Sequence, residues 1–226
     1  MNKKVIVGGA AAVTIAGLTA YRIISQQQNG QEEADKWTVA DMPELNGKVV
    51  VVTGANSGIG FAAAKEFARK GALTILACRN MDKAQAAEAE IQVDIPQAQT
   101  EIMALDLNSL DSVHQFATKF KQQYDRLDIL VNNAGIMMVP YGTIEDGFEK
   151  QLGVNHLGHF ALTGLLMDVI LNTPGARVVN ISRNAHHRGT IEYDHLLRED
   201  GRLVLLDAAG ERGAELEHRQ QHLIGV

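Results

Sequence analysis

The stretch Val-Val-Val-Val-Thr-Gly-Ala-Asn-Ser-Gly-Ile-Gly at residues 49–60 decides the fold. Four valines predict a buried strand, and the glycines that follow stand directly before an alanine-rich segment at 61–67 that favours a helix. A strand, a glycine turn and a helix start in this order let backbone N–H groups face a pyrophosphate with no Cβ in the way. The stretch therefore predicts nucleotide binding. The alternative is an ordinary strand–turn–helix connection without a ligand.

Apolar runs alternate with helical segments from residue 47 onward. Short apolar runs without a two-residue alternation are typical of strands that are buried on both faces of a parallel sheet. The expected strands lie at 48–53, 73–78, 101–105, 127–131 and 176–181, and the expected helices at 58–70, 81–92, 109–124 and 148–171. This alternation of strands and helices predicts an α/β fold.

The bulk composition limits the classes of protein that fit. The 226 residues are enough for one sizeable α/β domain and too few for two. A net charge of −6 argues against a nucleic-acid partner, because a phosphate backbone repels an acidic protein. Cys78 is the single cysteine, which excludes an intramolecular disulfide and indicates a reducing compartment.

An uncharged, mainly apolar run occupies residues 5–20. As a helix it covers roughly 24 Å of a hydrocarbon core about 30 Å thick, and extension to Ile24 with Arg22 snorkelling completes a span. We therefore predict a membrane anchor at 1–24, in the endoplasmic reticulum, the mitochondrion or a bacterial inner membrane, followed by a polar linker at 25–46. A signal or transit peptide and a soluble extension are the alternatives.

The glycine spacing Gly54-x-x-x-Gly58-x-Gly60 differs from the commonest dinucleotide fingerprint and resembles that of the short-chain dehydrogenase/reductase family. Phrases further along resemble the retinol-dehydrogenase-like branch of that family, at 76–81, 145–149, 155–160 and 185–189. The resemblance covers residues 47–200. It implies a Rossmann-like doubly wound parallel sheet flanked by helices, and an oxidoreductase that interconverts an alcohol and a carbonyl on an apolar substrate.

The resemblance also implies which residues bind the dinucleotide. Gly54 would make the tight turn, Gly58 would permit close approach of the cofactor, and Gly60 would let the helix pack on the strand. Arg79 ends the second expected strand, where a guanidinium suits the 2′-phosphate of NADP(H) better than the 2′-hydroxyl of NAD(H). The implied cofactor-binding residues are Gly54, Asn56, Ser57, Gly58, Ile59, Gly60, Arg79, Asp106, Leu107, Asn132, Ala134 and Gly135.

The catalytic residues of the family are only partly matched. Members use a tyrosine as proton donor, a lysine four residues later, a serine and a helix asparagine, and Asn155 matches the asparagine. No lysine follows Lys150, and Tyr193 has a leucine four residues later, which cannot lower a phenol pKa. Ser182 precedes Arg183 where relatives carry a second, catalytic serine. Ser182 and Tyr193 are therefore weak candidates, and we expect impaired catalysis.

Two histidines on one expected helix could suggest a metal site. His156 and His159 stand three residues apart, but no third ligand is evident nearby. We therefore expect no bound metal.

The family likeness stops near residue 200, and the segment at 201–226 diverges from it. We expect a domain at 47–200 that is incomplete at its C-terminal side, as after a frameshift, a premature stop or an alternative exon, with one sheet edge open. A homodimer would lack its usual interface helix. The alternatives to an active oxidoreductase are a non-catalytic nucleotide-binding or regulatory module and a truncated product without function.

Overall fold

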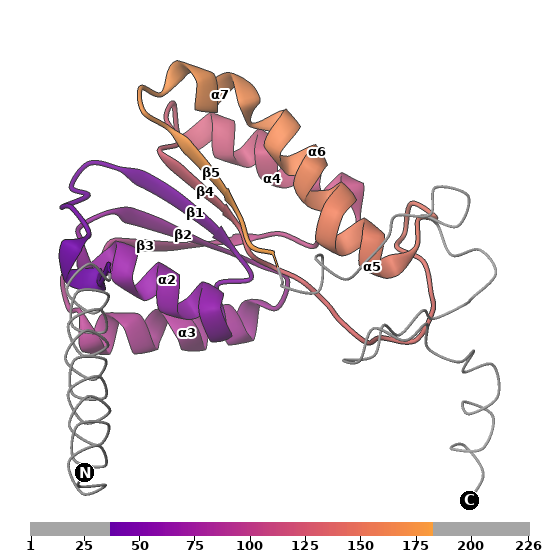
Figure 1. The fold of residues 1–226 in the computed structure, drawn as a ribbon, viewed down its shortest axis with the longest axis horizontal. Helices are drawn as coiled ribbons and strands as arrows, with labels where there is room; N and C mark the ends of the chain where they lie inside the picture. Colours follow the sequence, from indigo (N-terminus) through magenta and orange to yellow (C-terminus); the bar gives the residue numbers. More distant parts are fainter. Residues whose placement is uncertain (1–36, 183–226) are drawn as a thin grey trace, which may run out of the picture. The chain divides into compact units, whose positions relative to one another are not determined.

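The computed structural model describes residues 37–182 (Figure 1). The expected anchor at 1–24, Tyr193 and the divergent segment at 201–226 lie outside the described residues. Within the described part no helix is both long and apolar enough to cross a membrane. The chain divides into two compact units, Met1–Pro43 and Glu44–Val226.

The described part of the first unit contains one short 3-10 helix, η1 (Val39–Asp41). The Asp41 carboxylate accepts hydrogen bonds from the backbone N–H and the hydroxyl of Thr38, both at 2.8 Å. This pairing satisfies donors at the start of the turn.

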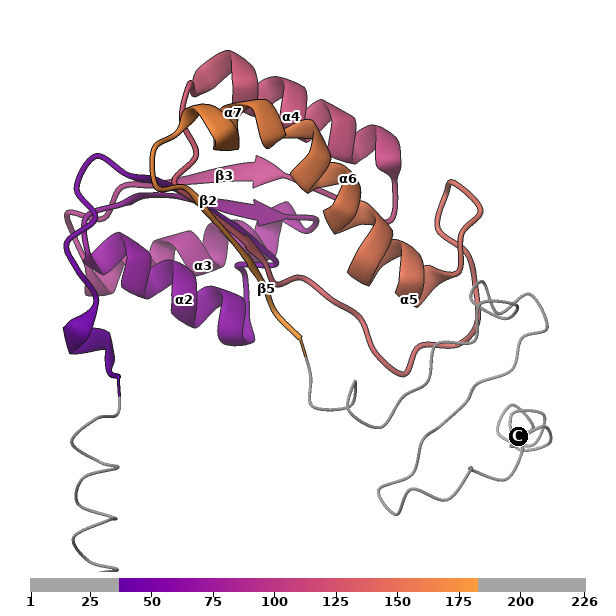
Figure 2. The same cartoon turned by 45° about the horizontal axis from the view of Figure 1, so that its top comes forward.

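The second unit is built on a sheet of five parallel strands in the order β3-β2-β1-β4-β5 (Figures 1 and 2). The strands are β1 (Val49–Thr53), β2 (Leu73–Cys78), β3 (Thr100–Ala104), β4 (Ile129–Asn132) and β5 (Arg177–Asn180). The chain adds β2 and β3 on one side of β1 and then returns to place β4 and β5 on the other. Ligands of open α/β sheets bind where the strand order reverses, which here is the carboxyl ends of β1 and β4.

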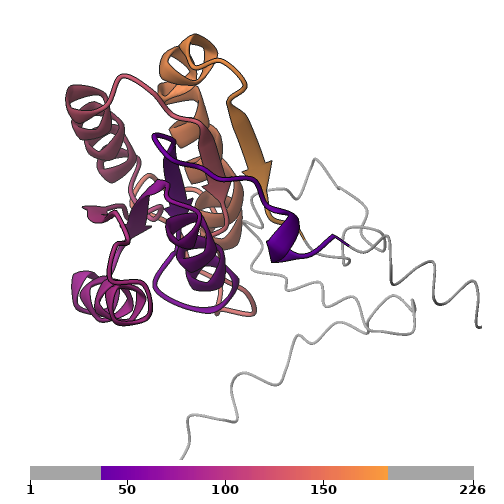
Figure 3. The same cartoon turned by 90° about the vertical axis from the view of Figure 1, so that its left-hand side faces the viewer.

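Helices cover both faces of this sheet. One face carries α2 (Gly58–Arg69) and α3 (Met81–Asp94), and the other carries α4 (Leu110–Gln123), α6 (Gly158–Leu165) and α7 (Met167–Asn172) (Figures 1 and 2). The same separation is visible from the side in Figure 3. The predicted fold class, a Rossmann-like doubly wound parallel sheet flanked by helices, is confirmed for the described residues.

The four-valine run forms the central strand and is buried along its whole length. Because β1 is covered on both faces, it needs no polar residue on alternate positions. Its neighbours in the core come from the sheet and from the helices on one face, and they include Ile75, Phe120, Leu130, Leu162 and Leu166. The rings of Phe116 and Phe120 stack with centroids 6.3 Å apart along α4.

The single helix expected at 148–171 is divided in the structure. A short helical turn, α5 (Lys150–Leu152), leads into a π-helical turn, η2 (Gly153–Leu157), and a break at Leu166 separates α6 from α7. The N–H of Gly158 bonds to the oxygen of Gly153, five residues earlier, so the helix accommodates one extra residue here. Such π-turns are frequent at functional sites, and this one carries Asn155.

A buried carboxylate joins β1 and β4 at their amino ends. The Asp128 carboxylate accepts hydrogen bonds from the Val49 N–H at 2.9 Å and from two Arg126 nitrogens at 2.8 and 2.7 Å, and it pairs with Lys48 at 3.0 Å. Burial alone would raise the pKa of this carboxyl, but the hydrogen bonds from Arg126, Val49 and Lys48 together lower it to about 2.

We expect Asp128→Asn to lower the free energy of unfolding by roughly 1–3 kcal/mol, because three donors lose a charged acceptor. The pKa of Asp128 is lower in the folded chain than the ordinary value of about 3.9, so its contribution is present above about pH 4. It is lost as the pH falls toward 2. Urea unfolding of the wild type and the variant between pH 3 and 7 measures both effects. Glu90→Gln, at an exposed carboxylate of α3, is the control and should unfold with the wild-type difference between pH 3 and pH 7.

Candidate nucleotide-binding site

The glycine turn connects β1 to α2 at the carboxyl edge of the sheet. Gly54 has φ +66°, a left-handed conformation that favours glycine, and its N–H donates to the oxygen of Ala77 at the end of β2, at 2.8 Å. A Cβ at Gly54 would lie 3.0 Å from the Cα of Ala134, and one at Gly60 would lie 2.6 Å from the oxygen of Gly54. Gly54 and Gly60 therefore allow the turn, the helix and the loop after β4 to meet without side chains between them.

Thr53 ties this turn to the loop after β4. Its hydroxyl oxygen accepts hydrogen bonds from the N–H groups of Asn133 and Ala134, both at 2.9 Å, and its main-chain oxygen accepts from the Asn133 amide at 2.9 Å. Sequence reasoning did not select Thr53 and Asn133, although Thr53 belongs to the quoted stretch at 49–60 and Asn133 stands between the implied residues Asn132 and Ala134. Their contribution is to hold the backbone of the site in place.

A cavity of about 410 Å³ opens beside the glycine turn, and it is smaller than a second cavity beside the loop after β4. The walls of the smaller cavity come from the ends of β1, β2, β3 and β4, and its lining includes most of the implied cofactor-binding residues: Gly54, Asn56, Ser57, Arg79, Asp106, Leu107, Ala134 and Gly135. The structure thus brings these residues together from four separate segments. Asn80 and Lys83 line the same cavity and were not selected from the sequence.

Two basic side chains border this smaller cavity. The Arg79 side chain is 66% exposed, and its Nη1 lies 4.0 Å from the Asp106 carboxylate, which is the outer limit for an ion pair. Lys83 stands in the first turn of α3, where Asn80 caps the helix by accepting the Lys83 N–H at 2.9 Å. The cavity therefore offers a guanidinium and an ammonium group at the end of β2.

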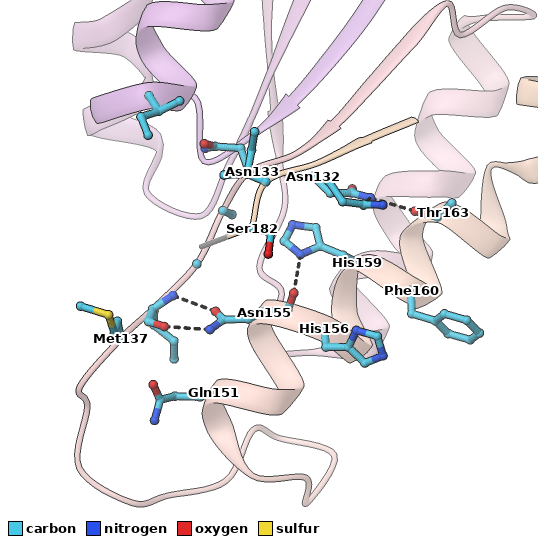
Figure 4. Close-up of a pocket in the computed structure, with 16 residues that line it drawn as sticks. Asn132, Asn133, Met137, Gln151, Asn155, His156, His159, Phe160, Thr163 and Ser182 are labelled. Atoms are coloured by element: carbon cyan, nitrogen blue, oxygen red, sulfur yellow. Dashed lines mark hydrogen bonds between the residues drawn. The ribbon is translucent and has the colours of Figure 1, made fainter. Parts of the chain in front are cut away.

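A larger cavity, about 980 Å³, lies on the other side of the loop after β4 (Figure 4). It shares Asn133, Ala134, Gly135 and Ile136 with the smaller one. Its remaining lining comes from α2, β4, the loop at Met137, α5, the π-turn, α6 and the end of β5, and it includes Gln151, Asn155, Phe160 and Ser182. Asn155 and Ser182, two of the three candidate catalytic residues, thus line one cavity.

Asn155 projects from the π-turn onto this loop. Its Oδ1 accepts the N–H of Ile136 and its Nδ2 donates to the oxygen of Ile136, both at 2.8 Å (Figure 4). The side chain therefore acts as a clamp on the backbone, and this pairing uses both ends of the amide.

Asn132 and Ile59 are implied cofactor residues that line the larger cavity and not the smaller one. The Asn132 Nδ2 donates to Asn180 Oδ1 at 2.8 Å and to Thr163 Oγ1 at 3.1 Å, so it joins β4, β5 and α6 on the wall of the larger cavity. Its Oδ1 is buried, and among residues 37–182 no donor is within hydrogen-bond distance of it. Ile59 has 70% of its surface exposed.

The free cysteine lies under the glycine turn. Burial raises the pKa of the Cys78 thiol, and the backbone N–H groups of Ala55 and Asn56 act in the opposite direction. Cys78 is therefore a neutral, packed side chain between β2 and the turn. Within residues 37–182, no group of three or more His, Cys, Asp and Glu side chains is placed to hold a metal ion.

Comparisons with known proteins define the class to which this fold and site belong. The family model described as short chain dehydrogenase matches residues 48–195, and the chain belongs to that family. Human retinol dehydrogenase 13 is 49% identical over 152 residues, which are 67% of this chain and 46% of the relative. The chain spans about half the length of the curated relatives it matches. The predicted likeness to retinol dehydrogenases is confirmed.

Solved structures agree with this assignment. A protein from Mycobacterium paratuberculosis has a TM-score of 0.63 and 44% identity, with 74% of this chain and 57% of that chain covered. A Shigella flexneri protein described as a short chain dehydrogenase, solved in complex with NADP, has a TM-score of 0.57 and 27% identity, covering 69% of this chain and 66% of its own.

We expect Gly60→Ala to lower the free energy of unfolding by roughly 1–3 kcal/mol, because a methyl group there meets the Gly54 oxygen and the Asn133 amide. Gly164→Ala is the matched control. It lies in α6 with open space around its Cβ position, so alanine should leave stability unchanged or raise it by up to about 1 kcal/mol. Chemical denaturation of the three proteins measures the difference. Equal stability of the Gly60 variant and the wild type would show that helix and turn do not pack as closely as described.

Proposed function

We propose that this chain binds NADP(H) along the carboxyl edge of the sheet and represents the cofactor-binding part of a retinol-dehydrogenase-like oxidoreductase. The observation that carries the proposal is the cradle at the start of α2, where Gly54, Asn56 and Ser57 line one cavity together with Arg79 and Asp106. Such a cradle at the start of a helix presents N–H groups to a pyrophosphate without steric obstruction. NAD(H) is the second choice.

The preference for NADP(H) rests on charge. A 2′-phosphate is best held by a guanidinium, which offers paired donors, and Lys83 adds a second cation in the same cavity as Arg79. Asp106 stands 4.0 Å from Arg79, at the outer limit for an ion pair, so the guanidinium remains available to a phosphate. The NADP complex of the Shigella flexneri structure supports the same ligand class.

The residues of this chain would bind and orient, and the dinucleotide would supply the hydride. The turn at 54–58 holds the pyrophosphate, Arg79 and Lys83 hold the 2′-phosphate, and Asp106 and Leu107 lie where the adenine is bound in the family. The larger cavity then receives the nicotinamide and an apolar alcohol or carbonyl substrate. Asn155 shapes that cavity by fixing the loop at Ile136.

Hydride transfer to a carbonyl also needs a proton donor near the oxygen. These 226 residues contain no Tyr-x-x-x-Lys pair after Asn155, and Ser182 is followed by arginine. We therefore propose that the chain by itself binds the dinucleotide and has impaired catalysis. The same observation favours a second candidate function, a non-catalytic module that binds the nucleotide and regulates a partner.

The proposed organisation places the membrane anchor at 1–24, the linker at 25–46, the NAD(P)-binding domain at 47–200 and a divergent tail at 201–226. The anchor would hold the domain at a membrane, with the domain in a reducing compartment. Fractionation of cells that express the full chain, compared with a chain that starts at residue 37, tests the anchor. Equal recovery of both forms in the soluble fraction would refute it.

We expect Arg79→Glu to weaken NADPH binding about 10- to 100-fold, because a charged hydrogen bond to phosphate is worth roughly 1.5–3 kcal/mol. Binding of NADH, which has no 2′-phosphate, should change far less. Isothermal titration of both dinucleotides measures the effect. Lys119→Glu makes the same charge reversal on the exposed side of α4 and is the control. Parallel losses for NADPH and NADH would contradict a 2′-phosphate role for Arg79.

We expect saturable NADPH binding without turnover of retinal or simple ketones by the 226-residue chain. The physical reason is the missing acid, since binding residues alone do not protonate the developing alkoxide. Single-turnover loss of NADPH absorbance measures hydride transfer directly. Reduction above background that disappears in Tyr193→Phe would overturn the proposed impairment, and it would make Tyr193 the proton donor.

A further inference from the structure

A buried histidine links the two cavities and has no role in the proposed function. His159, at the start of α6, is 6% exposed and lines the larger cavity (Figure 4). Its Nε2 lies 2.9 Å from the Thr53 hydroxyl, and its Nδ1 lies 3.1 Å from the main-chain oxygen of Asn155. Both ring nitrogens therefore have a partner inside the protein.

The partners determine where the ring carries its proton. The Asn155 oxygen is a carbonyl and can only accept, so Nδ1 must carry a hydrogen. The Thr53 oxygen already accepts two N–H groups, from Asn133 and Ala134, and this fills both of its lone pairs. A third donor from the ring has no lone pair left to meet. In this contact the Thr53 hydroxyl is therefore the donor and Nε2 the acceptor.

A competing acceptor for that hydroxyl hydrogen is the oxygen of Val131, but it lies at 3.3 Å against 2.9 Å for Nε2. The shorter distance favours the ring. Burial lowers the pKa of His159, and the nearby His156 acts in the same direction, although the hydrogen bond to the Asn155 carbonyl opposes them. Geometry and burial thus agree on a neutral imidazole.

We propose that His159 is a positioning residue, a neutral imidazole with its proton on Nδ1 that holds the Thr53 hydroxyl and the Asn155 backbone in one hydrogen-bonded ring. This closed chain of contacts runs from Thr53 to the loop at Asn133 and along that loop to Ile136. It then crosses to Asn155 and returns to Thr53 through His159. Each member fixes the next. Both cavities share this loop, so its position sets the shape of both.

Without His159 the hydroxyl of Thr53 turns to Val131 and the π-turn loses its link to β1. The expected result is a loop at 133–136 that opens more often, while β2 and β3, which lie outside the ring, are unaffected. The expected effect on NADPH affinity rests on the proposed function, because it requires that the dinucleotide binds against this loop.

The first test measures directly, in the full chain, which nitrogens of the His159 imidazole carry a proton. Long-range proton–nitrogen NMR with ¹⁵N-labelled histidine distinguishes the Nδ1–H form, the Nε2–H form and the imidazolium, and the His159 signals are assigned by their loss in His159→Gln. We expect the Nδ1–H form at pH 7, with an Nε2 resonance that shifts in Thr53→Val. An Nε2–H ring or an imidazolium would overturn the proposal, whether or not the chain binds NADPH.

The second test measures the loop. We expect His159→Phe to speed amide exchange at Asn133 and Ala134 roughly 3- to 10-fold, the worth of one hydrogen bond, with β2 amides unchanged. His159→Gln keeps an acceptor for Thr53 and should recover most of the protection. His114→Gln, on the exposed side of α4, is the control. Faster exchange throughout the sheet would show a merely structural role and refute the proposal.

A double-variant cycle tests whether His159 acts through Thr53. NADPH affinity should fall roughly 3- to 10-fold in His159→Phe and in Thr53→Val, and the pair together should be no weaker than the worse single variant. Additive losses would separate the two residues and overturn the proposal. Absence of NADPH binding by the wild type would refute the proposed function alone, since the ring form and amide exchange decide His159 without nucleotide.

Discussion

The hydroxyl group of Thr53 is the point on which the functional edge of this protein depends. It accepts N–H groups from a segment 80 and 81 residues further along the chain, and this pairing joins the end of β1 to the loop that divides the two cavities. Gly54 can turn away from β1 only because its backbone is left-handed and because no side chain separates it from Ala134. The buried hydroxyl of Thr53 and the glycine at position 54 together fix the end of β1, the glycine turn and the loop after β4.

Sequence reasoning succeeded where the physical cause is local. The four valines of β1 and the glycines after them are neighbours in the chain, and burial on two faces requires the pattern that they show. The parallel sheet and the likeness to the dehydrogenase family were likewise predicted from short runs of residues that are neighbours in the chain. The strand bounds of β2 agree with the expectation, and those of the other strands differ by one or two residues, which is ordinary for strand ends.

The contacts that sequence reasoning missed join residues distant in the chain. Nothing near Asn132 indicates that its amide faces α6 and β5, because the register with Asn180 decides that direction. The π-turn was missed for a related reason. The segment at 148–171 was expected to form one helix. The extra residue that brings Asn155 to Ile136 depends on a contact with the loop after β4, which is distant in the sequence. Asn133 and Lys83 become visible as site residues only when the strand ends are side by side.

The two ends of β4 are held by different kinds of chemistry. At the amino end a carboxylate meets a guanidinium and an ammonium group, and at the carboxyl end the Asn132 amide donates to a hydroxyl and to a second amide. Dissolved salt weakens ion pairs according to their exposure, so it acts on the first kind through the half-exposed Lys48 and Arg126 and hardly affects the second. Because the Asp128 carboxylate is itself buried, a rise in ionic strength would weaken the amino end of β4 only modestly and would leave the contacts beside the cavities unchanged.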